Sequence, residues 1–551
     1  MSPIDSYCEA VTRGDVPSGP YHRKACARHL RDRAREGTAD FPYVFDGARA
    51  ERFFRFATRL RHYKGEWAGQ YIQLQPHQQF RLGSLFAWVH QATGLRRFRA
   101  AYNELPRKNG KSLEAALVAL YGVFFDGEPG AEGYCVATKR DQAKIVFHDC
   151  QRLVLSSGLR SRITVLTVNM HREASASKLE PLGADRDSTD GLNPQVVIID
   201  EAHAMKDRGM IDVMETATGA RRQPLVFWIT TAGSDPVTPC GDQHHYACQI
   251  LDEVLVDETL FAFIAHAEDS DDPFAEATWR KANPNYGVSV RPDDLKALAT
   301  KAQALSAAEG AFKQKRLNLW VNALAPWLSL DGWRRGQTTW AAETLAGQPC
   351  WLGVDMSSKI DLTAIAACFP PHEERRAWRF LIWCLTPDDT LAERARRDRA
   401  PYQLWKQAGY LATNPGNRID QDEVRLIVRA AGAQFDVQLV GVDPWNAGNL
   451  EKDLGDDGFQ VVEVPQTLQQ MSAPSKEFEA DVLDGLVDAG DNPLMTWAVS
   501  NVVVQRDNKD NIYPVKKRSR GRIDPVIAAL IARKLASLDT AAADDPDLLT
   551  A

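Results

Sequence analysis

The stretch "ELPRKNGKSLEAALVALYG" (Glu104–Gly122) restricts the fold of this chain more than any other segment. It places Gly-Lys-Ser directly before an apolar helical run, which is half of a phosphate-binding loop. The usual loop has a further glycine five residues before Gly110, and this chain has Leu105 there. An ordinary helix that begins with a lysine in its first turn would show the same tripeptide. The stretch therefore suggests a nucleotide site, and other segments have to decide the question.

Short apolar strands alternate with helices around this stretch. The segments "FRAAYNEL", "EGYCVAT", "NPQVVIID" and "QPLVFWITTAG" are predicted strands, and "KSLEAALVALYGVFF" and "RDQAKIVFHDCQRLVL" are predicted helices. Apolar strands that alternate with helices are typical of a parallel sheet buried on both faces. We therefore predict an α/β fold for the first part of the chain.

Length and composition set the class of protein. The 551 residues predict two or three domains, and 44% hydrophobic and 25% charged residues are ordinary for a soluble globular protein. With a formal net charge of -7, contact with nucleic acid would have to come from local basic patches. Nine scattered cysteines without a Cys-x-x-Cys pair indicate reduced thiols in a cytosol. The N-terminus lacks the layout of a signal peptide, and no apolar run approaches the roughly 18 residues of a membrane span.

Shifts in composition predict where the domains begin and end. "NALAPWLSLDGWRRGQ", with proline, glycine and tryptophans expected to be exposed, has the character of a linker, and the C-terminal tail is small and acidic. The expected parts are an N-terminal domain over 1–325 (helical and charged over about 1–65, helical and acidic over about 236–325), a linker over 326–348, a second strand-rich domain over 349–538, and a flexible tail over 539–551.

Two further segments support the nucleotide site. Backbone N–H groups at a helix N-terminus hold phosphate, Lys111 would reach the terminal phosphates, and Ser112 would reach Mg²⁺. In "VVIIDEAH", Asp200 and Glu201 end an apolar strand, where the aspartate can hold Mg²⁺ through water and the glutamate can polarise the attacking water. Two solvated acids in a turn would look similar. An apolar strand that ends in Asp-Glu within an α/β pattern is less common, and favours an ATPase.

Further polar residues are candidates for the same site. "WITTAGS" ends another strand, and Thr230, Thr231 and Ser234 could sense the γ-phosphate, although a polar turn is the alternative. An arginine often neutralises charge in the transition state, sometimes from a neighbouring subunit. Arg107 in the loop and Arg140 at a strand-to-helix turn are the candidates, and ordinary surface arginines are the alternative.

Three spaced aspartates indicate a second chemistry. Asp355 follows the strand in "WLGVDMSSKIDLTAIA", Asp443 follows the strand in "VQLVGVDPWNAG", and Asp524 begins the helix in "GRIDPVIAALIARKL". Carboxylates held on rigid elements can bind two Mg²⁺ ions roughly 4 Å apart, which cut a phosphodiester. Asp361 is a further possible ligand. Alternatively, Asp524 is a helix N-cap and Asp443 a turn residue before proline.

Two other patterns are weighed beside the aspartates. The basic segment "VKKRSRGR" could hold a DNA backbone electrostatically, or it could be a solvated loop. Its charged residues are Lys516, Lys517, Arg518, Arg520 and Arg522. "CGDQHHYAC" offers Cys240, His244, His245 and Cys248 as zinc ligands, but the spacing is unusual and the segment is also typical of a helix, which we prefer.

The order of these parts, from about residue 60 to 535, resembles the large terminase subunit of tailed bacteriophages. "LQPHQQF" is similar to the family's adenine-contacting glutamine motif, with Gln78 as the contact, although His77 stands where a tryptophan is often found. "PRKNGKS" resembles the family's loop, which commonly lacks the first glycine, so that Arg107, Asn109 and Gly110 join Lys111 and Ser112 as expected nucleotide ligands.

The remaining motifs also resemble those of the family. "ATKRDQAKIVF" is similar to the segment that carries a trans-acting arginine, here Arg140, and "TTAGS", with Thr231, resembles the coupling motif. "VVIIDEAH" matches the magnesium and catalytic-carboxylate motif. "GVDMSSKIDLTA", "GVDPWNAG" and "RIDPVIAAL" are similar to the family's ribonuclease H-like nuclease motifs.

The resemblance implies an α/β protein with two activities. An N-terminal P-loop NTPase sheet with a helical lid would use ATP and Mg²⁺ to move double-stranded DNA into a procapsid, and a C-terminal ribonuclease H-like domain would cut the DNA with two Mg²⁺ or Mn²⁺ ions. The implied partners are the portal protein, the small terminase subunit and further copies of the chain in a pentameric ring, and no membrane is involved. The implied location is the host cytoplasm, outside the mature virion. The alternatives are a helicase-nuclease of DNA repair and a nucleotide-gated scaffold without catalysis.

Overall fold

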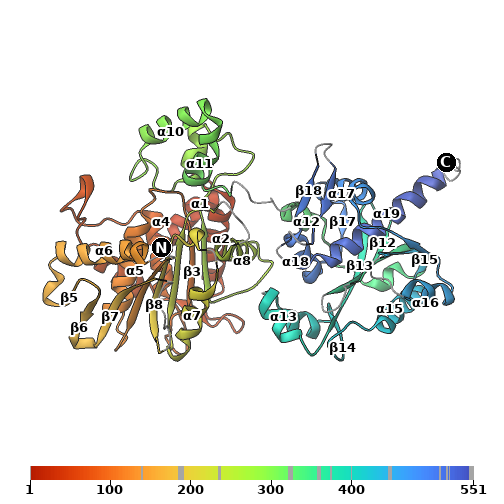
Figure 1. Cartoon of the computed structure of the whole chain (residues 1–551), viewed down its shortest axis with the longest axis horizontal. Coiled ribbons are helices and arrows are strands. Elements are labelled where there is room, and N and C mark those ends of the chain that lie inside the picture. The colour runs from red at the N-terminus through yellow and green to blue at the C-terminus, as the bar shows by residue number, and fades with distance from the viewer. Residues whose placement is uncertain are drawn as a thin grey trace. The chain divides into compact units, whose positions relative to one another are not determined.

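The chain divides into two compact units, Met1–Ala323 and Leu324–Ala551, which are described separately (Figure 1). The structure is a computed structural model. It describes residues 2–137, 140–183, 191–205, 207–233, 238–320, 327–356, 362–372, 375–398, 400–444, 449–507, 511–516, 519 and 521–544.

The first unit is built on an eight-stranded sheet whose central strands are parallel. β3, β9 and β8 are neighbours in this sheet, so their carboxyl ends lie side by side. The apolar residues of β8 are buried, as expected for a central strand between two layers of helices. The strand order is β10 (Leu260–Ile264), β3 (Ala100–Glu104), β9 (Leu225–Thr230), β8 (Pro194–Asp200), β4 (Glu132–Ala137), β7 (Ser177–Gly183), β6 (Met170–Arg172) and β5 (Thr164–Val165), of which β6 and β5 pair antiparallel.

Helices surround this sheet, and the first of them form the helical region predicted at the N-terminus. α1 begins with a capping box at Ser2 followed by proline, which satisfies N–H groups of its first turn. The helices are α1 (Pro3–Arg13), α2 (Pro20–Ala34), α3 (Gly47–Ala57), α4 (Pro76–Ala87), α5 (Lys111–Phe124), α6 (Arg140–Ser156), α7 (Gly209–Ala217) and α8 (Pro239–Leu251), with a small hairpin of β1 (Tyr43–Phe45) and β2 (Trp88–His90).

A small helical cluster follows the sheet, shown in green above it in Figure 1. It consists of α9 (Glu276–Ala282), α10 (Pro292–Ala304) and α11 (Ser306–Leu317), and its own core includes Trp279, Leu295 and Phe312. The expectation of helical structure over 236–325 is wrong at β10, which pairs parallel with β3. A short apolar run such as "LFAFI" does not distinguish a buried strand from a buried helix by its periodicity.

The second unit has a seven-stranded mixed sheet. β11, β12 and β13 pair antiparallel, whereas β15 pairs parallel with β11 and β16 pairs parallel with β15. The strands are β11 (Pro349–Asp355), β12 (Thr363–Phe369), β13 (Trp378–Pro387), β14 (Ala412–Asn414), β15 (Asp436–Val442), β16 (Val461–Glu463) and β17 (Val487–Asp488), with a separate hairpin of β18 (Val504–Arg506) and β19 (Ile512–Pro514).

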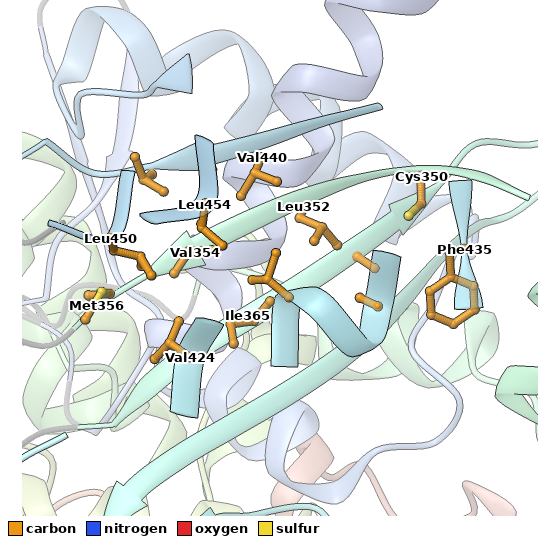
Figure 2. Packing of buried hydrophobic residues seen from close by; sticks show 14 of the residues in the cluster. Cys350, Leu352, Val354, Met356, Ile365, Val424, Phe435, Val440, Leu450 and Leu454 are labelled. Atoms are coloured by element: carbon orange, nitrogen blue, oxygen red, sulfur yellow. The ribbon is translucent and has the colours of Figure 1, made fainter. Parts of the chain in front are cut away.

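Helices cover both faces of this sheet. Leu352 and Val354 of β11 point into an apolar cluster with Val424 of α15 and Leu450 of α16 (Figure 2). Gly353, between them in sequence, faces the opposite side, where a Cβ would lie 2.1 Å from the Ala528 carbonyl oxygen of α19. The helices are α12 (Leu330–Gly336), α13 (Leu391–Asp398), α14 (Tyr402–Gln407), α15 (Gln421–Gln434), α16 (Leu450–Asp456), α17 (Leu468–Leu483), α18 (Pro493–Asn501) and α19 (Asp524–Asp544).

Two expectations at the borders of this unit need correction. Trp327 and Trp333, expected to be exposed in a linker over 326–348, are buried, and the Trp333 indole donates to the Thr496 hydroxyl at 3.0 Å. The reason is that α12 packs on α17 and α18. Helix α19 continues to Asp544, beyond the start of the predicted tail over 539–551, because three alanines, which are strong helix formers, follow Thr540. Residues 545–551 lie outside the described residues.

Candidate nucleotide and nuclease sites

The loop between β3 and α5 has the backbone of an anion-binding turn. Gly110, the N-cap of α5, has φ 83°, and Lys108 has φ 71°. A Cβ on Gly110 would lie 3.0 Å from the Gln78 amide nitrogen, so a side chain there would be both strained and crowded. The N–H groups at the start of α5 are therefore available at the carboxyl edge of the sheet, where an anion binds best.

Lys111 points from α5 back into this loop. Its ammonium donates to the Leu105 carbonyl at 3.0 Å and to the Thr231 hydroxyl. Burial lowers the pKa of Lys111, and the nearby carboxylates of Glu201 and Asp200 oppose that shift. The structure thus brings together residues from all three segments that the sequence singled out for nucleotide.

The acidic pair lies at the end of β8, next to β9. Burial raises the pKa of Asp200 to about 7, and the charge of Glu201 adds to this effect. Glu201 adopts φ 49°, and its carboxylate lies 3.1 Å from Nδ1 of His203. The same His203 ring lies 3.1 Å from the Thr230 hydroxyl. His203 was not singled out from the sequence, although it belongs to the same "DEAH" segment.

The predicted adenine contact, Gln78, lies against the loop with both ends of its amide engaged. Its oxygen accepts from the Gln75 N–H at 2.9 Å, and its nitrogen donates to Glu114 at 2.8 Å. Glu114 also forms an ion pair with Arg81 at 2.6 Å, and both side chains are fully buried. Sequence reasoning missed Arg81 and Glu114, because nothing local marks two charged residues as partners 33 positions apart.

Asn109 ties the loop to the segment that follows α9. Its amide donates to the Asn283 side chain at 2.9 Å, and its side-chain oxygen accepts from the Asn285 N–H at 3.1 Å. The side-chain oxygen of Asn285 also accepts from Nε2 of His77 at 2.8 Å. His77 is the residue that stands where the family's motif often has a tryptophan. Asn109 is completely buried. The structure therefore gives Asn109 a role in holding the loop that does not depend on a ligand.

The remaining candidates for this site have few described contacts with it or lie outside the described residues. Ser112 is half-buried in the first turn of α5, and Arg107 is exposed, with its N–H bonded to the Lys315 carbonyl at 2.9 Å. Arg140 begins α6, but its side chain is not among the described ones. Ser234 lies outside the described residues.

Asn318, just after α11, connects three segments of the sheet edge. Its side-chain oxygen accepts from the Ala232 N–H at 2.7 Å, directly after the two threonines. Its side-chain nitrogen donates to Glu104 at 3.1 Å and to the Ala265 carbonyl at 2.8 Å. The carboxyl ends of β9, β3 and β10 are thus held by one amide.

The segment considered for zinc forms helix α8, as preferred from the sequence. His244 lies 2.8 Å from the Glu104 carboxylate and 3.5 Å from the Cys248 sulfur. Despite burial, which acts in the opposite direction, Cys248 and Glu104 raise the pKa of His244 to about 10. Cys240 contacts the Tyr102 hydroxyl instead. These side chains form a buried polar cluster between α8 and β3, the strand that leads into the phosphate-binding loop.

The three aspartates of the second unit stand at the ends of neighbouring elements. Val354 pairs with Val442, so Asp355 and Asp443 follow paired residues of β11 and β15. All three, with Asp524 at the start of α19, are buried. Burial raises the pKa of Asp524 to about 6, and the charge of Asp355 contributes to the rise. Asp361 lies outside the described residues.

A cation of the chain itself lies between two of these carboxylates. The Lys516 ammonium is 2.6 Å from Asp355 and 2.9 Å from Asp524, and Gln466 donates to the other oxygen of Asp355 at 2.9 Å. Three carboxylates on rigid elements are donors of the kind that Mg²⁺ and Mn²⁺ prefer. In the arrangement seen here, no three His, Cys, Asp or Glu side chains among the described residues stand close enough to hold a metal ion.

The rest of the basic segment is only partly described. Arg522 forms an ion pair with Asp398 at 3.4 Å. Lys517, Arg518 and Arg520 lie outside the described residues. Of the five basic side chains considered for DNA, Lys516 therefore faces the carboxylates and Arg522 contacts an acid of α13.

Fold and sites together define an ATPase joined to a metal-dependent endonuclease. A family model described as the endonuclease domain of the terminase large subunit matches residues 255–538, and a model described as its ATPase domain matches residues 76–249. The chain belongs to the terminase large subunit family. It therefore has the ATPase and the endonuclease of a phage DNA-packaging motor, uses nucleotide and divalent metal ions, and works with DNA and other parts of a packaging complex.

Individual relatives agree with this assignment. The chain is 27% identical over 498 residues to the large terminase subunit of Enterobacteria phage HK97, covering 87% of this chain and 94% of that one. It is 30% identical over 354 residues to protein YmfN of Escherichia coli K12, covering 62% and 77%. The crystal structure of the HK97 large terminase superposes with a TM-score of 0.51 at 26% identity, covering 88% and 99%.

These matches confirm the predicted combination of an ATPase and a nuclease domain, both α/β. They favour a packaging motor over the two alternatives, a repair helicase-nuclease and a scaffold without catalysis. Among the described helices, none has the length and apolar character that crossing a membrane requires.

Proposed function

We propose that ATP binds where the loop, β8 and β9 meet. Lys111 would contact the terminal phosphates, Ser112 and Asp200 would hold Mg²⁺, and Glu201 would orient and polarise the attacking water. The observation that supports this most strongly is the buried Lys111 ammonium between the Leu105 carbonyl and the Thr231 hydroxyl. Phosphate oxygens could take the place of these two acceptors, so the ammonium would keep its hydrogen bonds when nucleotide binds.

The remaining residues of this site would act around the phosphates. Thr231 would report the state of the γ-phosphate through its contact with Lys111, and Asn109 and Gly110 would shape the loop. Gln78 would face the adenine side, and the arginine that completes the site would be Arg140 or Arg107. The engaged amide of Gln78 suggests that its main task is to support the loop through Glu114.

For the nuclease, we propose that Asp355, Asp443 and Asp524 hold two Mg²⁺ or Mn²⁺ ions. Such ions, when bound, activate water and stabilise the leaving oxygen of a phosphodiester. The three ligands lie at the ends of two paired strands and at the start of a helix, which fixes where the backbone of each aspartate stands. The pairing of Val354 with Val442 is the observation that supports this most strongly.

The wider role we propose is that of a ring subunit on a portal. Double-stranded DNA, a portal protein, a small terminase subunit and further copies of this chain, in a pentamer, would be the partners. The work would take place in the host cytoplasm, and the chain would not remain in the mature virion.

Two matched substitutions test the two sites on the full chain. Glu201→Gln should abolish DNA-stimulated ATP hydrolysis but leave nucleotide binding intact, whereas Asp212→Asn, an exposed acid of α7, should change neither. Asp355→Asn should stop Mn²⁺-dependent plasmid cleavage but spare the ATPase, whereas Asp456→Asn, exposed on α16, should spare both. Turnover that persists in Glu201→Gln, or cleavage that persists in Asp355→Asn, would reject the corresponding assignment.

A further inference from the structure

Lys516 reaches the nuclease carboxylates from a surface hairpin. Its side chain is 38% exposed, whereas the side chains of its partners Asp355 and Asp524 are 0% and 6% exposed. It follows β19, whose Ile512 N–H bonds the Ser472 hydroxyl of α17 at 3.2 Å. The N–H of Val515, the residue before the lysine, bonds the Val503 carbonyl at 3.0 Å. The backbone that carries Lys516 to the carboxylates is thus paired across the hairpin and bonded to α17.

The ammonium stands where a bridging cation would stand. Two buried carboxylates repel each other unless a positive charge lies between them. Lys516 supplies that charge at distances of 2.6 and 2.9 Å. A divalent ion such as Mg²⁺ that bound both Asp355 and Asp524, at roughly 2.0–2.1 Å from the oxygens, would occupy the same space. Lysine and metal ion therefore cannot both bridge this pair of carboxylates.

We propose that Lys516 is a tethered competitor of the metal ion, which closes the nuclease site until the ion displaces it. This inference rests on the proposed metal nuclease. It adds that the metal affinity of the site is set by the β18–β19 hairpin as well as by the aspartates. An ordinary structural ion pair predicts something different, because its loss would weaken the protein equally with and without metal.

Binding of Mn²⁺ to the full chain without nucleotide, measured by calorimetry at pH 8, tests the proposal. Lys516→Met and Lys516→Gln should bind Mn²⁺ about tenfold more tightly or more, because coupling between close charges at desolvated sites is at least that large. Lys516→Arg, which keeps the cation, should stay close to the parent protein. Lys534→Met, which removes a lysine of α19 that contacts Gln470, is the control. Asp355→Asn identifies the heat that belongs to this site.

Thermal unfolding gives a second readout that is independent of cleavage. Without metal, Lys516→Met should unfold at a lower temperature than the parent protein, and saturating Mn²⁺ should remove most of that difference. Equal Mn²⁺ affinity in the parent protein and in Lys516→Met and Lys516→Gln, or an equal loss of stability with and without Mn²⁺, would overturn the competition but leave the metal nuclease intact. Absence of Asp355-dependent Mn²⁺ binding in every variant would overturn both.

Discussion

Replacing Arg81 with methionine probes the buried support of the phosphate-binding loop. Arg81 of α4 pairs with Glu114 of α5 at 2.6 Å, and neither side chain is exposed to solvent. Methionine fills most of the same volume but strands the Glu114 carboxylate, which keeps only the Gln78 amide as a donor. Because the carboxylate cannot reach water, it must remain charged with one donor or take up a proton.

The size of the effect follows from this burial. Removing one partner of a buried ion pair typically destabilises a protein by about 3–5 kcal/mol. The unfolding entropy is about 2.1 cal/mol/K per residue, which for Met1–Ala323 gives about 0.7 kcal/mol/K. The transition of the first unit should therefore move down by about 4–7 °C. The double change Arg81→Met with Glu114→Leu should recover at least half of the loss, because no stranded charge remains.

Scanning calorimetry of the full chain, with the first unit's transition identified by its shift on adding nucleotide, measures these values. Arg55→Met removes an exposed arginine of α3 and should leave the transition within about 1 °C. A shift below 2 °C in Arg81→Met would show that the pair contributes little. A double variant as unstable as Arg81→Met alone would show that a stranded Glu114 is not the cause.

Three further predictions concern other parts of the molecule. Lys111→Met should weaken ATP binding by about ten- to a hundredfold in a fluorescent-nucleotide titration without changing plasmid cleavage, since a hydrogen bond to a charged group is worth about 1.5–3 kcal/mol. Gly353→Ala should lower the urea midpoint of the second unit by the equivalent of about 1–3 kcal/mol, because its Cβ would meet the Ala528 carbonyl, whereas Gly455→Ala has open space and should not. Burial lowers the pKa of His22 to about 3, so between that pH and about 6.5 only the unfolded chain binds a proton at this residue. Lowering the pH from 7 to 5 should therefore destabilise the first unit by about 2 kcal/mol through His22. Urea unfolding of His22→Gln should lack that part of the pH dependence.

The parts of the sites that the sequence predicts are those with a characteristic motif of a few consecutive residues. Gly110 caps a helix that Lys111 begins, and the Asp-Glu pair ends an apolar strand, so both features could be found without knowledge of the fold. The three aspartates share the same property, because each stands where a regular element begins or ends. Parallel pairing of neighbouring strands then brings such ends together.

The rest depends on contacts between distant residues. Asn109 meets Asn283 and Asn285 only once the α9 segment has folded over the loop. Lys516 belongs to a basic run that predicts contact with DNA, yet its ammonium faces Asp355 and Asp524, because the hairpin before it turns the chain back into the unit. Sequence spacing contains no signal for either arrangement.

The position of Asn318 has a consequence for how the helical cluster can move. With its amide fastened to three strand ends, Asn318 is a fixed point at the C-terminal end of α11. A helix of 12 residues is about 18 Å long, so each 5° of tilt about that point would carry its opposite end by about 1.5 Å. The hydrogen bond from the Arg107 N–H to the Lys315 carbonyl lies close to Asn318, so its length would change little during such a tilt. A small shift of the phosphate-binding loop would therefore be accompanied by a much larger displacement of the end of α11 that lies far from Asn318.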